Sequence, residues 1–367
     1  MTELFKHIYN DKFFDKFLGT MIKVVPDFKT DHFMKKIYDN EWEQRELKQR
    51  MRHISLTLND YLPGVYSEKL EILLKSIPQL KQDGFKSDNL EFMFYPDYIE
   101  IYGIEHPEIS IPAFEEVTQF VSCEFAVRPF LLQYPDVMLT QMKEWTTHPH
   151  ASVRRLASEG CRPRLPWAMA LPFLKQKPDP IIPILETLKS DPSEYVRRSV
   201  ANNLNDVSKD HPLEVISIAR KWKGTSKETD KLVKHACRTL LKQGDSEVME
   251  MFGFGSTKHI NVVDFKVHTP LVRIGAHLEF SFKLKNNDTQ DALVRLEYGV
   301  YYQKANGSLS RKVYKISEKE YQSASETLIT RKQSFKLITT RKFHPGLHQV
   351  VVIVNGKEYE RLDFELK

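Results

Sequence analysis

Three segments of the chain repeat one short pattern of apolar and basic residues. VRRLAS begins at Val153, VRRSVA at Val196 and VKHACR at Val233, so the spacings are 43 and 37 residues. These spacings are close to those of HEAT and armadillo repeats, whose helices stack into a solenoid. The apolar stripe of each helix is expected to pack on its neighbours, with the paired basic residues on the other face. The repeat therefore predicts a mainly helical chain built of HEAT-like units.

The basic residues of these repeats occupy equivalent positions, namely Arg154, Arg155, Arg197, Arg198 and Lys234. Stacked repeats would place them in a row, and a row of cations at regular rise can follow a phosphate backbone. They are therefore predicted to bind DNA. The alternative is that they form salt bridges between repeats, as in HEAT arrays that bind proteins.

After about Gly255 the pattern changes from helical spacing to alternation of apolar and polar residues. The pairs Asn306-Gly307 and Asn355-Gly356 lie between such alternating segments, and Asn-Gly favours the type I′ turn of a β-hairpin. About 110 residues of short strands are typical of an antiparallel β-sandwich of the immunoglobulin type.

The change of pattern predicts two domains. Residues 1–256 are expected to form a HEAT-like helical-repeat domain that binds DNA and carries the active site. Residues 257–367 are expected to form the immunoglobulin-like domain, and MFGFGST (251–257) is expected to be the linker.

Charge is distributed unevenly along the chain. Residues 1–149 carry a net charge of −7, residues 150–242 carry +8, residues 243–256 carry −3 and residues 257–367 carry +7. Two basic regions suit a polyanionic partner. An unevenly charged solvated surface is the alternative explanation.

Several functional classes find no support in the sequence. Acidic and basic residues come too early at the N-terminus for a secretory signal, so none is expected, and no stretch reaches the roughly 18 uncharged apolar residues of a membrane span. Cys123, Cys161 and Cys237 are far apart and are expected to be reduced thiols of a cytoplasmic protein, without a metal site. The GxSxG, Walker and HExxH motifs of common hydrolases are missing.

Glu124 is predicted to lie on a helix that begins near Ala113, on or beside its apolar seam. A carboxylate there is partly desolvated, which costs free energy unless it is paired or used. The alternative to a functional role is an ion pair with Arg128 at i, i+4.

Asp206 is predicted to lie in the last turn of a helix that ends near Val207, on the face of Arg198 and Asn202. The helix dipole disfavours an anion there by roughly 0.3–1 kcal/mol. This placement suggests a functional acid, with chance placement as the alternative.

Trp167 follows Pro163 and Pro166 and is predicted to lie in the first turn of a helix. Beside Arg162 and Arg164, which are also predicted to bind DNA, its indole could either pack in the core or face a cationic ligand. Glu159 is expected either to pair with the arginine four residues before it or to act as a third acid.

At these residues the chain resembles the bacterial HEAT-like-repeat DNA glycosylases AlkC and AlkD, and specifically the AlkC branch. The resemblance is specific over about residues 110–256 and looser before them. It is carried by HASVRRLASEGCRPRLPWAMALPFL (150–174), DPSEYVRRSVANNLNDVSKDHP (191–212) and VKHACRTLLKQGD (233–245). Residues 257–367 resemble the immunoglobulin-like domain of one AlkC subgroup.

The resemblance implies that Glu124, Trp167 and Asp206 form the active site, with Glu159 and Arg155 carried over less directly. It implies removal of cationic N3-alkylated bases, such as 3-methyladenine and 3-methylcytosine, from double-stranded DNA. Carboxylates would stabilise the cationic sugar of the transition state and orient water. The duplex would be bent, and the lesion would be reached without a conventional base pocket.

This chemistry calls for no metal, nucleotide or redox cofactor, and the protein is expected to be a monomer in the bacterial cytoplasm, associated with the nucleoid. The basic β domain is expected either to clasp the duplex or to cap the last repeat. Two other functions remain open, a HEAT scaffold for proteins and a non-catalytic binder of branched or damaged DNA.

Overall fold

The computed structural model describes residues 5–87, 89–337 and 342–367. It divides into two compact units. The first comprises Met1–His211 and Trp222–Ala236, and the second comprises Pro212–Lys221 and Cys237–Lys367.

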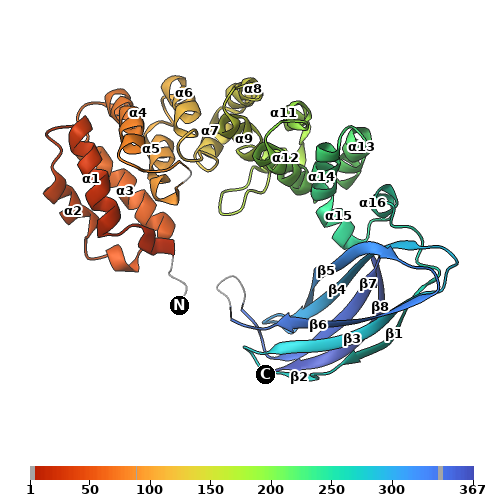
Figure 1. The fold of residues 1–367 in the computed structure, drawn as a ribbon. Helices are drawn as coiled ribbons and strands as arrows, with labels where there is room; N and C mark the ends of the chain where they lie inside the picture. Colours follow the sequence, from red (N-terminus) through yellow and green to blue (C-terminus); the bar gives the residue numbers. More distant parts are fainter. Residues whose placement is uncertain (1–4, 88, 338–341) are drawn as a thin grey trace. The chain divides into compact units, whose positions relative to one another are not determined.

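The first unit is a series of helices joined by short turns, which follow one another from α1 to α12 (Figure 1). Short 3-10 helices precede or interrupt the series in the described part of the chain: η1 (Phe5–Ile8), η2 (Trp42–Gln44), η3 (Leu90–Phe92) and η4 (Asp179–Ile181). The α-helices are α1 (Asp11–Val24), α2 (Thr30–Ile37), α3 (Leu47–Tyr61), α4 (Tyr66–Gln82), α5 (Phe94–Tyr102), α6 (Pro107–Val117), α7 (Val127–Gln133), α8 (Pro135–Trp145), α9 (Ala151–Glu159), α10 (Pro172–Gln176), α11 (Ile182–Leu188), α12 (Glu194–Val207) and α14 (Lys227–Ala236).

The three repeats found in the sequence lie on α9, α12 and α14, as predicted. Their first residues, Val153, Val196 and Val233, are buried, and α12 packs against both α9 and α14. Burial of this valine in each repeat explains why the pattern recurs, since apolar burial is the main force that holds stacked repeats together.

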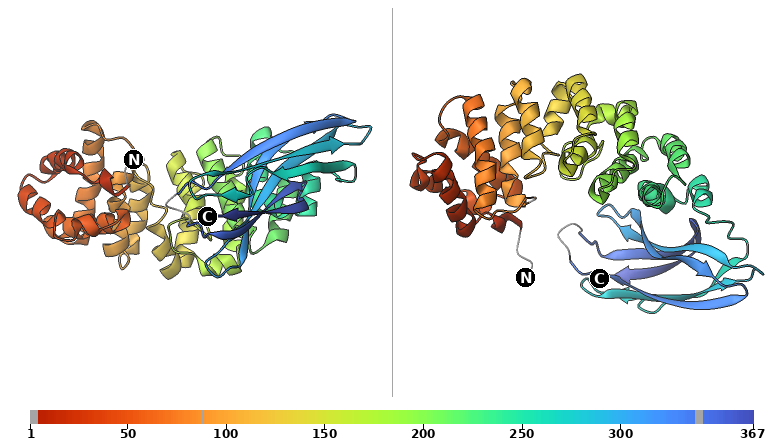
Figure 2. Two further views of the ribbon diagram at one scale, coloured as in Figure 1. Left: turned by 90° about the horizontal axis from the view of Figure 1, so that it is seen from below. Right: turned by 45° about the horizontal axis from the view of Figure 1, so that its top comes forward.

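The second unit is a β-sandwich with the last helices of the chain. Figure 2 shows its two layers of strands. Its helices are α13 (Pro212–Trp222), α15 (Arg238–Gln243) and α16 (Ser246–Met251). Its strands are β1 (Ile260–Val267), β2 (Leu271–Val272), β3 (His277–Asn286), β4 (Ala292–Gln303), β5 (Leu309–Tyr321), β6 (Ser325–Ser334), β7 (Gly346–Val354) and β8 (Lys357–Leu366).

One sheet has the order β1-β3-β6 and the other β2-β8-β7-β4-β5, and all pairs are antiparallel except the short β2–β8 pair. Alternate residues of both sheets form one apolar core, with Phe280, Phe282 and Val350 among its members. Strands begin at Ile260, after the predicted linker. The second unit also takes in α13, α15 and α16, which a division at residue 256 places with the repeats.

Both Asn-Gly hairpins are present, but their turns differ. Asn355 and Gly356 both have positive φ, 46° and 80°, as a type I′ turn requires. In the other hairpin Gly307 has a φ of 77° whereas Asn306 is not in the left-handed region, so the type I′ prediction is wrong there. That loop is longer than two residues, because Gln303 pairs with Leu309.

The β7–β8 turn makes a close backbone contact with the end of α15. A Cβ at Gly356 would lie 2.4 Å from the Cα of Gly244, and both glycines have positive φ. We expect Gly356→Ala to lower the free energy of unfolding of the second unit by about 2 kcal/mol or more, since it adds this overlap to the left-handed backbone.

Gly307→Ala is the matched control for that substitution. Gly307 also has positive φ, yet nothing lies within 4 Å of its added Cβ, so only the conformational cost of about 1 kcal/mol applies. Urea denaturation of both variants measures the difference, and equal losses would contradict the close-contact explanation.

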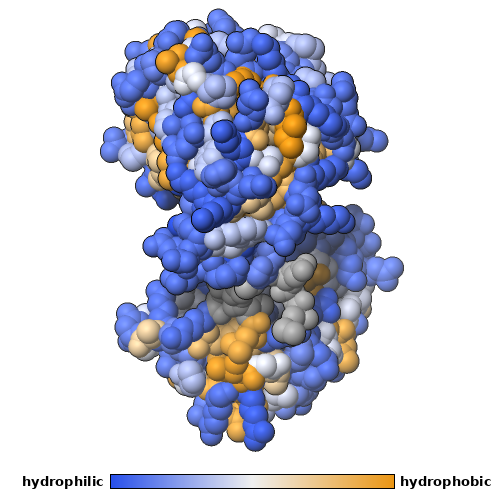
Figure 3. Space-filling model, turned by 90° about the vertical axis from the view of Figure 1, so that its left-hand side faces the viewer, coloured by the Kyte–Doolittle hydropathy of each residue, from blue (hydrophilic) through white to orange (hydrophobic). Residues whose placement is uncertain are grey.

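The described residues contain no helix that is long and apolar enough to cross a membrane. The face of the molecule in Figure 3 is largely hydrophilic, with separate hydrophobic patches. Scattered exposed apolar side chains of this kind are normal on globular proteins.

Candidate active site in the helical unit

A cavity of about 550 Å³ opens in the first unit. Its walls come from α3, α5, the segment between α6 and α7, α9, the start of α12 and the segment between α9 and α10. Glu124, Glu159 and Trp167 all line it, together with Arg155 and Arg162. The structure therefore brings most of the predicted catalytic residues to one place.

Glu124 does not lie on a helix, so that part of the prediction is wrong. Helix α6 ends at Val117 and α7 begins at Val127, and Glu124 lies in the turns between them. Pro129 fits the observed start of α7, because a proline is tolerated in the first turn of a helix.

The Glu124 carboxylate is held through one of its two oxygens. Its Oε2 accepts hydrogen bonds from Ser122 Oγ at 2.8 Å and from Arg155 Nη1 at 2.6 Å. No hydrogen bond or ion pair from the described residues reaches its Oε1. The side chain is 18% exposed and lines the cavity, so Oε1 is available to a ligand.

Arg128 does not pair with Glu124, so the predicted i, i+4 alternative is also wrong. Its buried guanidinium donates to the backbone carbonyls of Gly160, Arg162 and Met169 at 2.9, 2.8 and 2.7 Å. Burial lowers the pKa of Arg128 to about 10. These bonds fix the segment that carries Trp167, and no pattern in the sequence indicated them.

Trp167 lies in a turn rather than at the start of a helix, which begins instead at Pro172. Its φ of 67° is in the left-handed region, and the residue is 66% exposed at the cavity. Lys48 donates to its carbonyl oxygen from α3. A bulky residue held in this conformation is strained, and such strain is often found at functional sites.

Glu159 and Asp206 are linked through Arg162. Arg162 Nη1 lies 2.6 Å from Glu159 Oε1, and its Nε lies 2.9 Å from Asp206 Oδ2. Lys209 Nζ lies 3.0 Å from the other Asp206 oxygen. Asp206 is in the last turn of α12, as predicted, but it is only 2% exposed and is not among the residues that line the cavity.

Arg155 connects this pair to Glu124, because its Nη2 lies 3.6 Å from Glu159 Oε1. Burial opposes the charge on Arg155, but Glu124 and Glu159 outweigh it and raise the pKa of the guanidinium. Burial also opposes the charge on Arg162, but Glu159 and Asp206 outweigh it and raise the pKa of that guanidinium. The result is a chain of alternating charges that runs from the cavity into the protein.

Two of the predicted DNA-binding arginines hold the turns between repeats, and DNA binding by them stays a prediction. Arg154 Nη1 donates to the carbonyls of His148 and Pro149, and Arg197 Nη1 donates to those of Asp191 and Pro192. Arg154 is also paired with the Asp191 carboxylate at 2.6 Å. Their equivalent positions in the repeat therefore have a structural explanation.

The other predicted DNA-binding residues differ in their surroundings. Arg162 is buried, and Arg164 is paired with Asp210 at 2.6 Å. The Arg198 side chain is 61% exposed and lies 3.7 Å from Glu194, and Lys234 is partly exposed. DNA binding by these side chains stays a prediction.

Sequence reasoning also missed Asp97 on the cavity wall formed by α5. Its carboxylate is 3% exposed, accepts a hydrogen bond from Ser55 and lies 2.9 Å from Arg52. Burial raises its pKa to about 6, which Ser55 and Arg52 only partly oppose. An acid at the apolar start of α5 gave no local signal of burial.

Asp97 should therefore make stability depend on pH. Its folded pKa is above the unfolded value, so its contribution is fully present below about pH 4 and is lost as pH rises through about 6. From pH 7 to pH 5 we expect the free energy of unfolding of the protein to rise by about 1 kcal/mol relative to Asp97→Asn. Urea denaturation at both pH values tests this, and a constant difference between the proteins would contradict it.

Comparison with known proteins supports this picture. Residues 116–240 match the family model of DNA alkylation repair enzymes, and residues 261–367 match that of the C-terminal Ig-like domain of the uncharacterised protein YhaZ. The chain is 42% identical over 361 residues to the uncharacterized protein YhaZ of Bacillus subtilis (strain 168), covering 98% of this chain and 99% of that one.

A solved structure is similar over the whole length. It is the Pseudomonas fluorescens alkylpurine DNA glycosylase AlkC bound to DNA containing an abasic site analog, with a TM-score of 0.92, 33% identity and 100% of both chains covered.

Proposed function

Since the chain belongs to the AlkC-like family of DNA alkylation repair glycosylases, with the Ig-like domain of YhaZ at its C-terminus, we propose that it hydrolyses the N-glycosidic bond of cationic N3-alkylated bases. The substrate is double-stranded DNA that contains 3-methyladenine or 3-methylcytosine. The product is an abasic site and the free base.

The observation that carries the proposal is the cavity with Glu124 and Glu159 in its wall and Trp167 exposed beside them. One oxygen of each carboxylate is paired with arginine. No hydrogen bond or ion pair within the described ranges reaches the other oxygen. Two partly engaged carboxylates in the wall of a cavity suit a reaction in which positive charge develops on the substrate.

The chemistry follows from the charge of the lesion. An N3-alkylated base is already cationic, so it can leave without a general acid, and the transition state resembles an oxocarbenium ion at the sugar. Glu124 Oε1 is positioned to stabilise that cation or to accept a proton from the attacking water. The exposed indole of Trp167 adds attraction for a cationic ring or sugar.

Asp206, which was expected to act in the active site itself, has an indirect role in this proposal. Because both of its oxygens are paired and it does not line the cavity, it acts through Arg162. Arg162 in turn fixes Glu159. Asp206 is thus a positioning residue.

The related AlkC structure contains DNA, and we propose duplex DNA as the partner of this chain. The net charge of +8 over residues 150–242 and the exposed Arg198 are consistent with contacts to phosphates. Replacing Arg198 with alanine should weaken DNA binding and reduce its dependence on salt.

The decisive experiment is a base-release assay with the full chain on duplexes containing 3-methyladenine, 3-methylcytosine or 7-methylguanine. We expect 3-methyladenine to be released without added metal. DNA binding without release of any base would contradict the proposal and favour a non-catalytic DNA-binding protein.

A further inference from the structure

Arg155 holds the two carboxylates of the cavity in place relative to each other. It reaches Glu124 with Nη1 and Glu159 with Nη2. A guanidinium has five donors, and it could satisfy the same carboxylates in more than one arrangement. The arrangement seen therefore needs further contacts that select it.

Ser122 is the first of these contacts. Its hydroxyl accepts a hydrogen bond from Arg155 Nη1 at 3.0 Å and donates one to Glu124 Oε2 at 2.8 Å. Ser122, Arg155 and Glu124 thus each contact the other two, and the Arg155 Nη1–Glu124 Oε2 distance is 2.6 Å.

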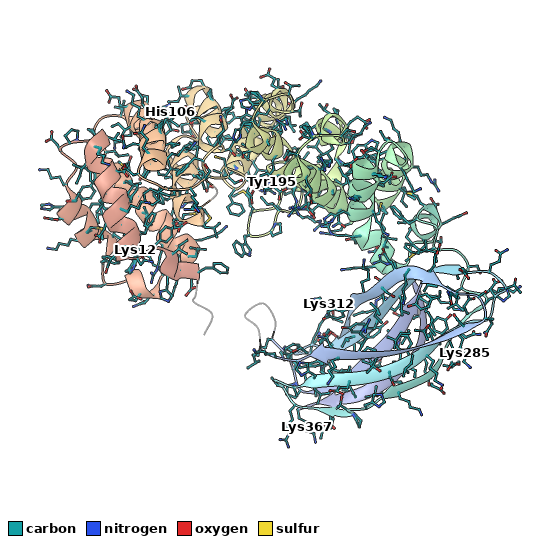
Figure 4. The ribbon with its side chains drawn as sticks, in the orientation of Figure 1. Lys12, His106, Tyr195, Lys285, Lys312 and Lys367 are labelled. Atoms are coloured by element: carbon teal, nitrogen blue, oxygen red, sulfur yellow. The ribbon has the colours of Figure 1, made fainter. Side chains whose placement is uncertain are left out.

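Tyr195 is the second contact. It lies in the first turn of α12 and is labelled in Figure 4. The Arg155 guanidinium carbon lies over its ring, 4.5 Å from the ring centre. Such a cation–π contact favours a guanidinium stacked on the ring and so restricts the plane of Arg155.

Together these contacts set the orientation of the Glu124 carboxylate and leave one of its oxygens for the cavity. The torsion that turns a glutamate carboxylate has broad minima, so an ion pair alone leaves the plane of the carboxylate variable. Two donors on Oε2 fix the carboxylate and leave Oε1 for the cavity.

Resting on the function proposed above, we propose that Ser122 and Tyr195 are positioning residues for the reaction, which lock Arg155 so that the Glu124 carboxylate keeps one orientation, with the oxygen that Arg155 and Ser122 do not contact left for the substrate. Neither touches the reacting atoms in this scheme. Neither was singled out by the sequence, because their relation to Arg155 arises only when α9, α12 and the segment before α7 come together.

The test measures single-turnover base release and DNA affinity separately for four variants. Ser122→Ala and Tyr195→Leu should each slow release about 5- to 20-fold while the Kd for DNA changes less than about twofold, as expected from the loss of one charged hydrogen bond or one cation–π contact. Ser122→Thr keeps the hydroxyl and Tyr195→Phe keeps the ring, so both should restore most of the rate. Ser67→Ala, at an exposed serine of α4, is the control.

A double-mutant cycle shows whether the residues act through Arg155. In an Arg155→Ala background, or Arg155→Lys if the alanine variant does not fold, Ser122→Ala should have little further effect on the rate. Additive effects would overturn the proposal, and so would wild-type rates for both Ser122→Ala and Tyr195→Leu.

These outcomes are separable from failure of the proposed function. If the wild-type protein releases no base, that function fails, and crystal structures then decide the positioning role. We expect Ser122→Ala to show Glu124 or Arg155 in a changed or second orientation. An unchanged pair would overturn the proposal.

Discussion

Replacing Glu124 with glutamine should slow single-turnover release of 3-methyladenine by about 100-fold or more, with little change in the Kd for DNA. The substitution keeps the shape of the side chain but removes the negative charge nearest the cavity, and loss of one preorganised electrostatic contact commonly costs this much in rate. Binding should be almost unaffected, because a carboxylate contributes nothing favourable to phosphate contacts.

The measurement compares excision and binding on the same duplex. Glu71→Gln is a suitable control, because Glu71 is an exposed residue of α4 whose partner is Lys75. A Glu124→Gln protein that excises at the wild-type rate would show that another group supplies the charge, and Glu159 would then be the first candidate. A variant that simply fails to bind DNA would also contradict the assigned role.

The helical repeats and the sandwich could be predicted because their signals are local. Val153, Val196 and Val233 recur at repeat spacing and are buried on successive helices. The pair Asn355-Gly356 carries in two residues the backbone geometry of its turn. Patterns of this kind depend on neighbours in the sequence, and tertiary contacts only reinforce them.

The details of the site could not be predicted, because they depend on contacts between distant residues. The turn at Trp167 is fixed by Arg128 and Lys48, which lie 39 and 119 residues away in the chain. Helical spacing near Glu124 suggested a continuous helix, whereas α6 ends at Val117 and α7 begins only at Val127. The residue types were identified from the sequence, whereas the conformation of the segments that carry them was not.

The second large effect is expected from Asp206→Asn. Arg162 is buried between Glu159 and Asp206, so removing one charge leaves a buried guanidinium with a single anionic partner. Breaking a buried pair completely costs about 3–5 kcal/mol. Because Glu159 remains and asparagine can still accept a hydrogen bond, we expect a loss of about 1–3 kcal/mol in the free energy of unfolding.

The same change should also reduce activity. Arg162 is expected to move toward Glu159 and weaken the contact of Glu159 with Arg155, so the effect passes along the chain of charges to the cavity. We expect base release to slow about 10- to 100-fold, a cost in transition-state stabilisation of about 1–3 kcal/mol. DNA affinity should change much less than the rate.

Asp210→Asn is the control that separates the effect of losing the Asp206–Arg162 pair from a general loss of negative charge near the end of α12. Asp210 pairs with Arg164 near the surface, where an ion pair contributes at most about 1 kcal/mol. Denaturation with urea and single-turnover release should therefore distinguish the two variants. If Asp206→Asn were as stable and as active as Asp210→Asn, the pairing through Arg162 would have no part in the reaction, and Glu124 and Glu159 would have to be oriented by Arg155 alone.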